Sequence, residues 1–246
     1  MAIRALHIGA HNDECEYNSG GVAYLLHKAG CEQIFLNIAC LWHKKNIDEQ
    51  TKAWYQKQEN EAAEHLGAKK VIIGDRDRQI FNPSIELTEE VEQIILDFKP
   101  DIVFIHWPKD KHIEHRMVSK LSYEALCIAW VHGARFKEVY AFEGCFKQTC
   151  DYFHPDFIVD VEEALPALHD SLVCFDQNTA NGAAWYDEKV LQCGARGRPL
   201  KIKYGEGYKI IKYPNGSDDF LLKKLLGDKF LWNGSGMYPA QAELFF

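Results

Sequence analysis

Two short clusters of histidine and acidic residues carry the side chains that could do chemistry in this chain. The first, His11-Asn12-Asp13-Glu14, directly follows an apolar run. The second, His112-Ile113-Glu114-His115, follows another apolar run and is preceded by Asp110. A buried strand has no packing reason to end in such a cluster, whereas binding and catalytic residues gather in the loops that follow rigid elements. The clusters therefore predict a site that binds a metal and holds a general base.

Three of these side chains match the ligand set of a catalytic metal site. Zinc in such sites takes three protein ligands, drawn from histidine and carboxylate, and keeps one position open for water. His11, Glu14 and His115 would supply that set. A bound metal lowers the pKa of its water toward neutrality and so produces a nucleophile. Zn²⁺ is the expected cofactor, but two histidines and a carboxylate also accept other divalent metals such as Fe²⁺.

Two further residues are candidates for moving protons. Asp13 lies beside the predicted ligands and would accept a proton from the attacking water. His112 would stabilise the oxyanion and protonate a leaving amine. A solvated, charged loop is the alternative interpretation of the second cluster taken alone, and its pairing with the first cluster argues against that alternative. The predicted chemistry is metal-dependent hydrolysis of an amide.

Alternating apolar and helix-favouring segments must position the two clusters. Apolar runs over residues 4–10, 33–40, 70–74 and 101–106 predict strands, and the segments 20–29, 48–66 and 86–98 between them predict helices. Further helices are expected at 117–131, 162–174 and 183–192, and further strands at 138–143, 156–161 and 201–213. This alternation is typical of βαβ units, so we expect an α/β, Rossmann-like fold with a mostly parallel sheet and helices on both faces. Ligands bind beyond the carboxyl ends of such strands, which would place both clusters at one edge.

Composition narrows the expected partners and location. A net charge of −8 argues against nucleic acid as a partner, and the chain contains no apolar stretch of the roughly 20 residues that span a membrane. Eight cysteines without a CxxC pair, and no signal-peptide pattern, predict a cytoplasmic protein. Because composition does not change along the chain, we expect a single domain over residues 1–246. The apolar end Leu244-Phe245-Phe246 should dock on the fold or on a neighbouring subunit of a homo-oligomer.

The clusters resemble the motifs of the PIG-L/LmbE-like de-N-acetylases. These are metal-dependent enzymes of Rossmann-like fold that remove acetyl groups from N-acetylglucosamine-type sugars. The family's first motif, His-Pro-Asp-Asp-Glu followed by a Gly-Gly helix, is similar to His11-Asn12-Asp13-Glu14 followed by Gly20-Gly21. Its second motif, His-Pro-Asp-His, is similar to His112-Ile113-Glu114-His115. A weaker similarity joins Tyr204-Gly205-Glu206-Gly207-Tyr208 to the family segment Tyr-Ala-Glu-Ala-Phe.

The resemblance implies the same roles that the chemistry of the residues suggests. His11, Glu14 and His115 would bind the metal, Asp13 would be the base and His112 the acid. Glu114 and Asp110 would be carboxylates that orient histidines. The implied substrate is a small N-acetylated sugar conjugate. Two alternatives remain open, namely an amidase acting on a different amide conjugate and a non-catalytic metal-binding or sugar-binding relative.

The chain also departs from the family motifs. Asn12 and Ile113 replace the two prolines, which loosens the backbone but removes no ligand. Glu14 and Glu114 replace aspartates and are one methylene longer. The backbone of Glu14 or the metal must therefore shift from its place in the family.

Candidate substrate-binding residues lie outside the two clusters. Arg76 and Arg78 follow the third predicted strand and would hold a hydroxyl-rich or phosphorylated group, unless they form a solvated turn. Trp107 could stack on a sugar face or could cover the core. Glu206 and Tyr208 are expected to line the site through the late segment.

Overall fold

Eight strands form one sheet in the part of the chain that the computed structural model describes, residues 2–38, 48–73, 83–144, 153–175, 182–212 and 219–233. The strand order is β3-β2-β1-β4-β5-β7-β6-β8. The first five strands in that order are mutually parallel, whereas β7 is antiparallel to β5 and β6, and β8 is antiparallel to β6. Their bounds are β1 Arg4–Gly9, β2 Glu32–Asn37, β3 Lys69–Ile72, β4 Ile102–His106, β5 Glu138–Phe142, β6 Phe157–Asp160, β7 Gly205–Lys212 and β8 Phe230–Trp232.

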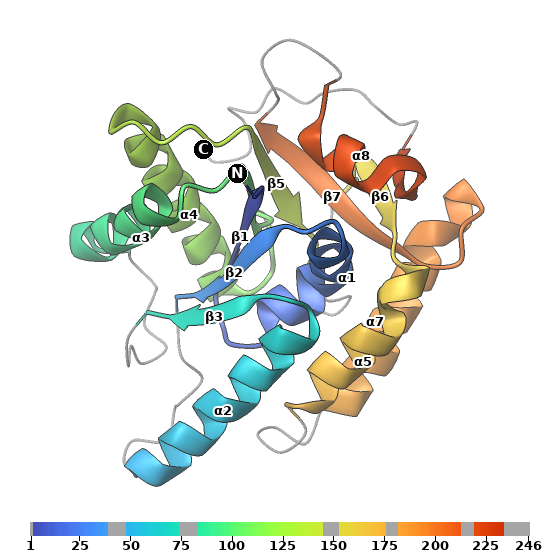
Figure 1. Cartoon of the computed structure of the whole chain (residues 1–246), viewed down its shortest axis with the longest axis horizontal. Coiled ribbons are helices and arrows are strands. Elements are labelled where there is room, and N and C mark those ends of the chain that lie inside the picture. Colours follow the sequence, from blue (N-terminus) through green and yellow to red (C-terminus); the bar gives the residue numbers. More distant parts are fainter. Residues whose placement is uncertain are drawn as a thin grey trace.

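Helices cover both faces of this sheet, as Figure 1 shows. α3 and α4 lie on one face, and α1, α2, α5 and α7 lie on the other. The predicted α/β, Rossmann-like fold is therefore confirmed, although α8 and β8 had not been predicted. The bounds are α1 Glu14–Lys28, α2 Glu49–His65, α3 Ile85–Phe98, α4 Ile113–Val131, α5 Leu165–Val173, α7 Gly182–Gly197 and α8 Leu221–Leu226, with short 3₁₀ turns η1 Glu162–Ala164, η2 Arg198–Leu200 and η3 Gly227–Lys229.

The strand β4 shows why the central sequence segments are almost continuously apolar. Val103 and Ile105 pack into the core beneath α3 and α4. Ile102 and Phe104 point the other way and join the core that α1 and α8 contribute to. Successive side chains of a strand face opposite sides, so a central strand between two helical layers must be apolar at every position.

Two helices begin earlier than the sequence pattern predicted, and both differences concern the site. α1 begins at Glu14 rather than residue 20, and α4 begins at Ile113 rather than residue 117. The first turn of each helix carries two or more charged or histidine side chains, so neither shows the apolar repeat that signals a helix. As a result, Glu14 is the first residue of α1, and His115 lies in the first turn of α4.

A break inside α1 explains the role of Glu206. The backbone leaves helical geometry at Ser19, with φ −131° and ψ 16°, so the following turn begins with unpaired N–H groups. The Glu206 carboxylate accepts hydrogen bonds from two of them, Gly21 N at 3.0 Å and Val22 N at 2.9 Å, and a third from the Tyr208 hydroxyl at 2.7 Å. Glu206 and Tyr208 are 2% and 0% exposed, and these hydrogen bonds show that Glu206 supports the helix.

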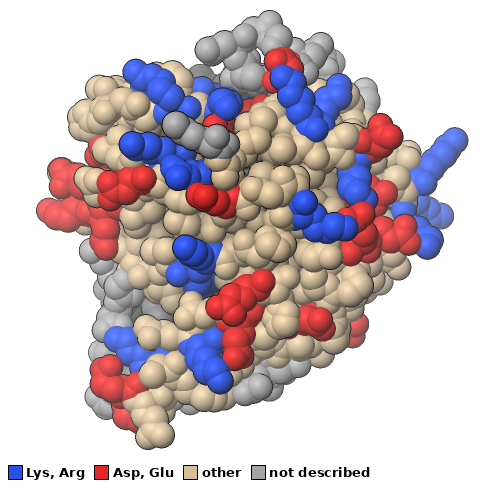
Figure 2. All heavy atoms as spheres, in the orientation of Figure 1, with Lys and Arg blue, Asp and Glu red and all other residues tan. Residues whose placement is uncertain are grey.

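The described helices include none that is long and apolar enough to cross a membrane. On the face shown in Figure 2, acidic and basic side chains are interspersed, and neither sign covers a large continuous area.

Candidate active site

The structure brings the two clusters together at one edge of the sheet. β1 and β4 are adjacent parallel strands, so the segments beyond their carboxyl ends meet. The ring centroid of His11 lies 5.1 Å from that of His112 and 5.5 Å from that of His115. The rings of His112 and His115 are 4.5 Å apart. His11 therefore faces the same small volume as His112 and His115, which follow it by about a hundred positions in the sequence.

Glu14 occupies the centre of this volume. Its Oε1 lies 2.8 Å from His11 Nδ1 and also contacts His115 Nε2. Its Oε2 accepts hydrogen bonds from the backbone N–H groups of Ala10, at 2.7 Å, and His11, at 2.9 Å. The longer side chain thus folds back over its own loop, and the loop's N–H groups hold the carboxylate against the histidines. This geometry accommodates glutamate where the family motif has aspartate.

His106 is a site residue that the sequence analysis missed. It is the last residue of β4 and is fully buried. Its Nε2 lies 2.8 Å from Glu14 Oε2 and 2.9 Å from the Ala10 nitrogen, and its ring stacks on His115 with centroids 4.4 Å apart. The signal available in the sequence was a histidine ending an otherwise apolar strand. It was not used because His106 lies outside the spacing of either cluster.

The carboxylates of the second cluster contact the histidines. Asp110 Oδ2 lies 3.1 Å from His115 Nδ1, and Asp110 Oδ1 accepts a hydrogen bond from the His112 backbone at 2.8 Å. Glu114 Oε2 lies 2.8 Å from His11 Nε2 and 4.0 Å from His112 Nδ1. Carboxylates in such positions fix the ring orientation of metal-binding histidines.

The charges in the site shift its pKa values strongly. Burial opposes ionisation of Glu14, but the neighbouring charges of His115, His11 and His106 outweigh it and hold the pKa of Glu14 well below its usual value. Burial likewise opposes protonation of His11 and His115, yet the Glu14 carboxylate raises their pKa values to about 10 and about 9. Burial and the Glu14 charge raise the pKa of Asp13. A metal would displace protons from His11 and His115 because only neutral imidazole is a ligand.

The donor set fits a divalent metal. Ligand atoms of His11, His112 and His115 lie within 4.8 Å of one another, and so do those of His106, Asp110 and His115. Nδ1 of His112 and Oε1 of Glu114 are buried without a hydrogen-bond partner among the described residues. Imidazole nitrogen and carboxylate oxygen are ligands that zinc and other first-row metals accept. The structure thus adds His106, Asp110 and His112 to the candidate ligands predicted from the sequence.

A buried network beneath the first cluster replaces the constraint of the missing proline. The Asn12 side-chain amide donates to the Glu59 carboxylate, and the Asn12 carbonyl accepts from Lys70 Nζ. Lys70 also pairs with Glu16 at 2.6 Å, and both side chains are inaccessible to solvent. Asn37 donates to the carbonyl of His11. Side chains from β2, α2 and β3 therefore hold the loop that carries His11 and Asp13.

The predicted substrate residues have different outcomes. Trp107 is 3% exposed and packs edge-on against Phe153 within the core, with ring centroids 5.5 Å apart, which favours its core-packing alternative. Arg76 and Arg78 lie outside the described residues, and so does the apolar end at Leu244-Phe245-Phe246.

A comparison with known families matches the segment that carries the site. The family described as PIG-L, GlcNAc-PI de-N-acetylase, matches residues 6–126, a segment that includes both clusters. This chain carries a PIG-L domain. The matched segment begins in β1 and ends within α4, so it contains β2, β3 and β4 and both clusters but not β5.

Solved structures share the fold over most of the chain. GalB, the 4-carboxy-2-hydroxymuconate hydratase of Pseudomonas putida KT2440, aligns at a TM-score of 0.73 and 21% identity over 89% of this chain and 99% of its own. The N,N'-diacetylchitobiose deacetylase of Pyrococcus horikoshii aligns at 0.66 and 22% identity over 85% and 84%. A zinc-inhibited form of teicoplanin deacetylase aligns at 0.58 and 15% identity over 88% and 100%. At these identities the likeness establishes the fold.

Proposed function

We propose that this protein is a metal-dependent hydrolase that removes the acetyl group from an N-acetylglucosamine-type amino sugar or its conjugate. The observation that carries the proposal is the convergence of His11, Glu14 and His115 beside Asp13, within the PIG-L domain. Two deacetylases of the same fold, acting on diacetylchitobiose and on teicoplanin, support the choice of substrate class.

His11, Glu14 and His115 would hold the metal, with Zn²⁺ as the expected ion and Fe²⁺ as the alternative. When bound, the ion would polarise the acetyl carbonyl and lower the pKa of the attacking water. Asp110 and Glu114 would keep the rings of His115 and His11 in a fixed orientation through the contacts described above.

The protons of the reaction would pass through Asp13 and His112. Asp13 would accept a proton from the attacking water, and burial beside Glu14, which raises its pKa, strengthens it as a base. Burial and the neighbouring histidines lower the pKa of His112, which makes its protonated form a stronger acid for the leaving amine. Water adds to the acetyl carbon, the carbon–nitrogen bond breaks, and the products are acetate and a free amine.

Three alternatives draw on the same residues. A different amide conjugate would need the same ligands and protons. A metal-binding or sugar-binding relative would keep the ligands and lose turnover. A hydratase, as GalB is, would direct the activated water to a carbon–carbon double bond. The family match favours deacetylation among these.

Metal analysis combined with acetate release from a panel of N-acetylated sugars tests the proposal. We expect Asp13→Ala to keep the metal and to lose roughly 10²–10⁴-fold in acetate release, because the general base is gone. His115→Ala should lose the metal, whereas the control His65→Ala, an exposed histidine of α2, should change neither measurement.

Two results would contradict the proposal. Unchanged metal stoichiometry in His115→Ala would overturn the ligand assignment. A metal-loaded wild-type protein that releases no acetate from the panel would overturn the deacetylase, and hydration of an unsaturated carboxylic acid by that protein would identify a hydratase.

A further inference from the structure

The break at Ser19 divides α1 into two parts, and the candidate metal ligand Glu14 lies in the first. This first part, residues 14–18, is a little more than one turn that begins at Glu14 and ends at Asn18. Side chains four positions apart in a helix lie one above the other, so Asn18 lies one turn below Glu14. Where a helix is interrupted, carbonyl groups before the break and N–H groups after it lose their helical partners. The rest of α1 therefore does not fix the direction of the first part by itself.

A buried ion pair connects the two parts across the break. Nζ of Lys189, from α7, lies 3.1 Å from Oε1 of Glu206, from β7, and the two residues are 3% and 2% exposed. Lys189 Nζ also lies 3.4 Å from the carbonyl oxygen of Asn18 and 5.5 Å from the ring centroid of Tyr17. Lys189 thus contacts the first part of α1, while Glu206 holds the second part through the two N–H groups described above.

The second part of α1 admits Glu206 because it begins with glycine. A Cβ atom at Gly21 would lie 2.8 Å from Glu206 Oε1 and 2.7 Å from Val161 Cγ1, both too close for real contacts. The carboxylate therefore reaches the backbone only where no side chain stands in its way. This gives the Gly20-Gly21 pair of the sequence a structural reason at its second position.

Lys189 keeps its charge although it is buried. Burial opposes protonation of the amine, but the charge of Glu206 outweighs burial and raises the pKa of Lys189. Apolar side chains of similar volume can replace many buried ion pairs without loss of stability, so such a pair is weak evidence of a stabilising role. Its directional contacts with the first part of α1 indicate a role in positioning instead.

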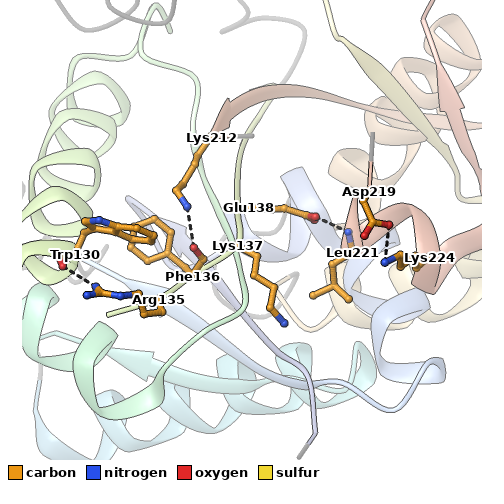
Figure 3. A pocket seen from close by; sticks show the side chains of 9 residues that line it. All are labelled: Trp130, Arg135, Phe136, Lys137, Glu138, Lys212, Asp219, Leu221 and Lys224. Carbon is orange, nitrogen blue, oxygen red and sulfur yellow. Dashed lines mark hydrogen bonds and ion pairs between the residues drawn. The ribbon is translucent and has the colours of Figure 1, made fainter. Parts of the chain in front are cut away.

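A second carboxylate shows the same pattern of hydrogen bonds without the lysine. Glu138 accepts from the backbone N–H groups of Leu221 and Leu222 at the start of α8, and from the hydroxyl of Tyr140 two positions on. Figure 3 shows the bond between Glu138 and Leu221. Among the described residues no lysine forms an ion pair with Glu138, whereas Lys189 pairs with Glu206. Glu138 begins β5 and so lies at the edge of the sheet opposite to the candidate active site.

We propose that Lys189 and Glu206 are positioning residues for Glu14 and act through the first part of α1. This inference rests on the metal ligands of the proposed function. Lys189 holds the end of the turn that Glu14 begins, and Glu206 fixes Lys189 relative to the rest of the helix. Without the pair, the turn would settle in a different direction, and the Glu14 carboxylate would meet the histidines in a different geometry.

Titration of the metal-free protein with Co²⁺ tests this inference. Histidine and carboxylate ligands accept Co²⁺, and the visible spectrum of the bound ion depends on the geometry of its ligands. We expect Lys189→Met to bind Co²⁺ about 10–100-fold more weakly than the wild type and with an altered spectrum, because the support of a ligand is lost. Lys209→Met is the matched control. It breaks a buried pair on the same strand, 2.6 Å from Asp156, and should leave the affinity and the spectrum unchanged.

A second pair of variants tests the carboxylate. Glu206→Gln removes the charge that pairs with Lys189 but keeps the size of the side chain, and it should alter the cobalt spectrum in the same way as Lys189→Met. Glu138→Gln makes the same change in the matching carboxylate at α8 and should not alter the spectrum.

Three outcomes would overturn the inference. The first is that both Lys189→Met and Glu206→Gln keep the affinity and spectrum of the wild type, in which case the ligand assignment of the proposed function stands. The second is that Lys209→Met changes both quantities as much as Lys189→Met does, because a general loss of stability would then explain the change. The third is that the wild-type protein binds no Co²⁺, which overturns the ligand assignment as well.

Discussion

The two clusters that meet at the candidate active site are held by different kinds of support. Beneath the first, side chains from three other elements converge, with Asn37 on the His11 carbonyl and Glu59 and Lys70 on Asn12. The second is held largely by its own segment. Arg116 donates to the carbonyls of Asp110 and Lys111, and Asp110 accepts from the backbone of His112. The first cluster is therefore coupled to the stability of the whole fold, whereas the second is coupled mainly to the start of α4.

Removing the charge of Lys70 should have the largest effect of any change to these supports. Lys70→Met leaves the carboxylate of Glu16 buried without its partner at 2.6 Å and frees the Asn12 carbonyl. Breaking a buried ion pair on one side costs about 3–5 kcal/mol of unfolding free energy. Urea denaturation measures the loss, and Lys69→Met, at an exposed neighbour on the same strand, should change it by less than about 0.5 kcal/mol. Equal losses in the two variants would show that the first cluster is not held by this network.

Neutralising Glu59 should change how stability depends on pH. Burial raises the pKa of Glu59 to about 7, against an unfolded value of about 4.3. The folded chain thus binds this proton more tightly than the unfolded chain does. The stabilisation that results is full below about pH 4 and is lost as pH rises through 7. From the size of the shift, the loss is roughly 4 kcal/mol.

Glu59→Gln removes this titration while keeping an oxygen that can accept from Asn12. We expect the variant to match the wild type near pH 4 and to be more stable than it at pH 8. Denaturation midpoints measured from pH 4 to pH 8 test this, with Glu61→Gln on the same helix as the control. Parallel pH profiles for wild type and Glu59→Gln would show that Glu59 does not titrate in this range.

Local sequence pattern predicted the parallel half of the fold and the clusters, but not the contacts that support them. Strands such as β4 are apolar at every position because both faces are covered, and that signal is visible in a short window. Glu59 lies on a helix whose sequence is mostly polar, yet it is buried against Asn12, 47 positions away. His106 meets Glu14 across 92 positions. Contacts of this kind depend on how the strands are ordered in the sheet, which no spacing within a motif records.

The smallest effect on stability is expected from the support of the second cluster. Arg116→Met removes the two hydrogen bonds to the carbonyls of Asp110 and Lys111, and Arg116 is partly exposed, so unfolding free energy should fall by only about 1 kcal/mol. Metal affinity should fall more clearly, by about tenfold, since Asp110 orients the ring of His115. Metal titration alongside urea denaturation separates the two quantities, and Lys120→Met on the exposed side of α4 is the control. If Arg116→Met instead lost as much stability as Lys70→Met, the two clusters would be held in the same way.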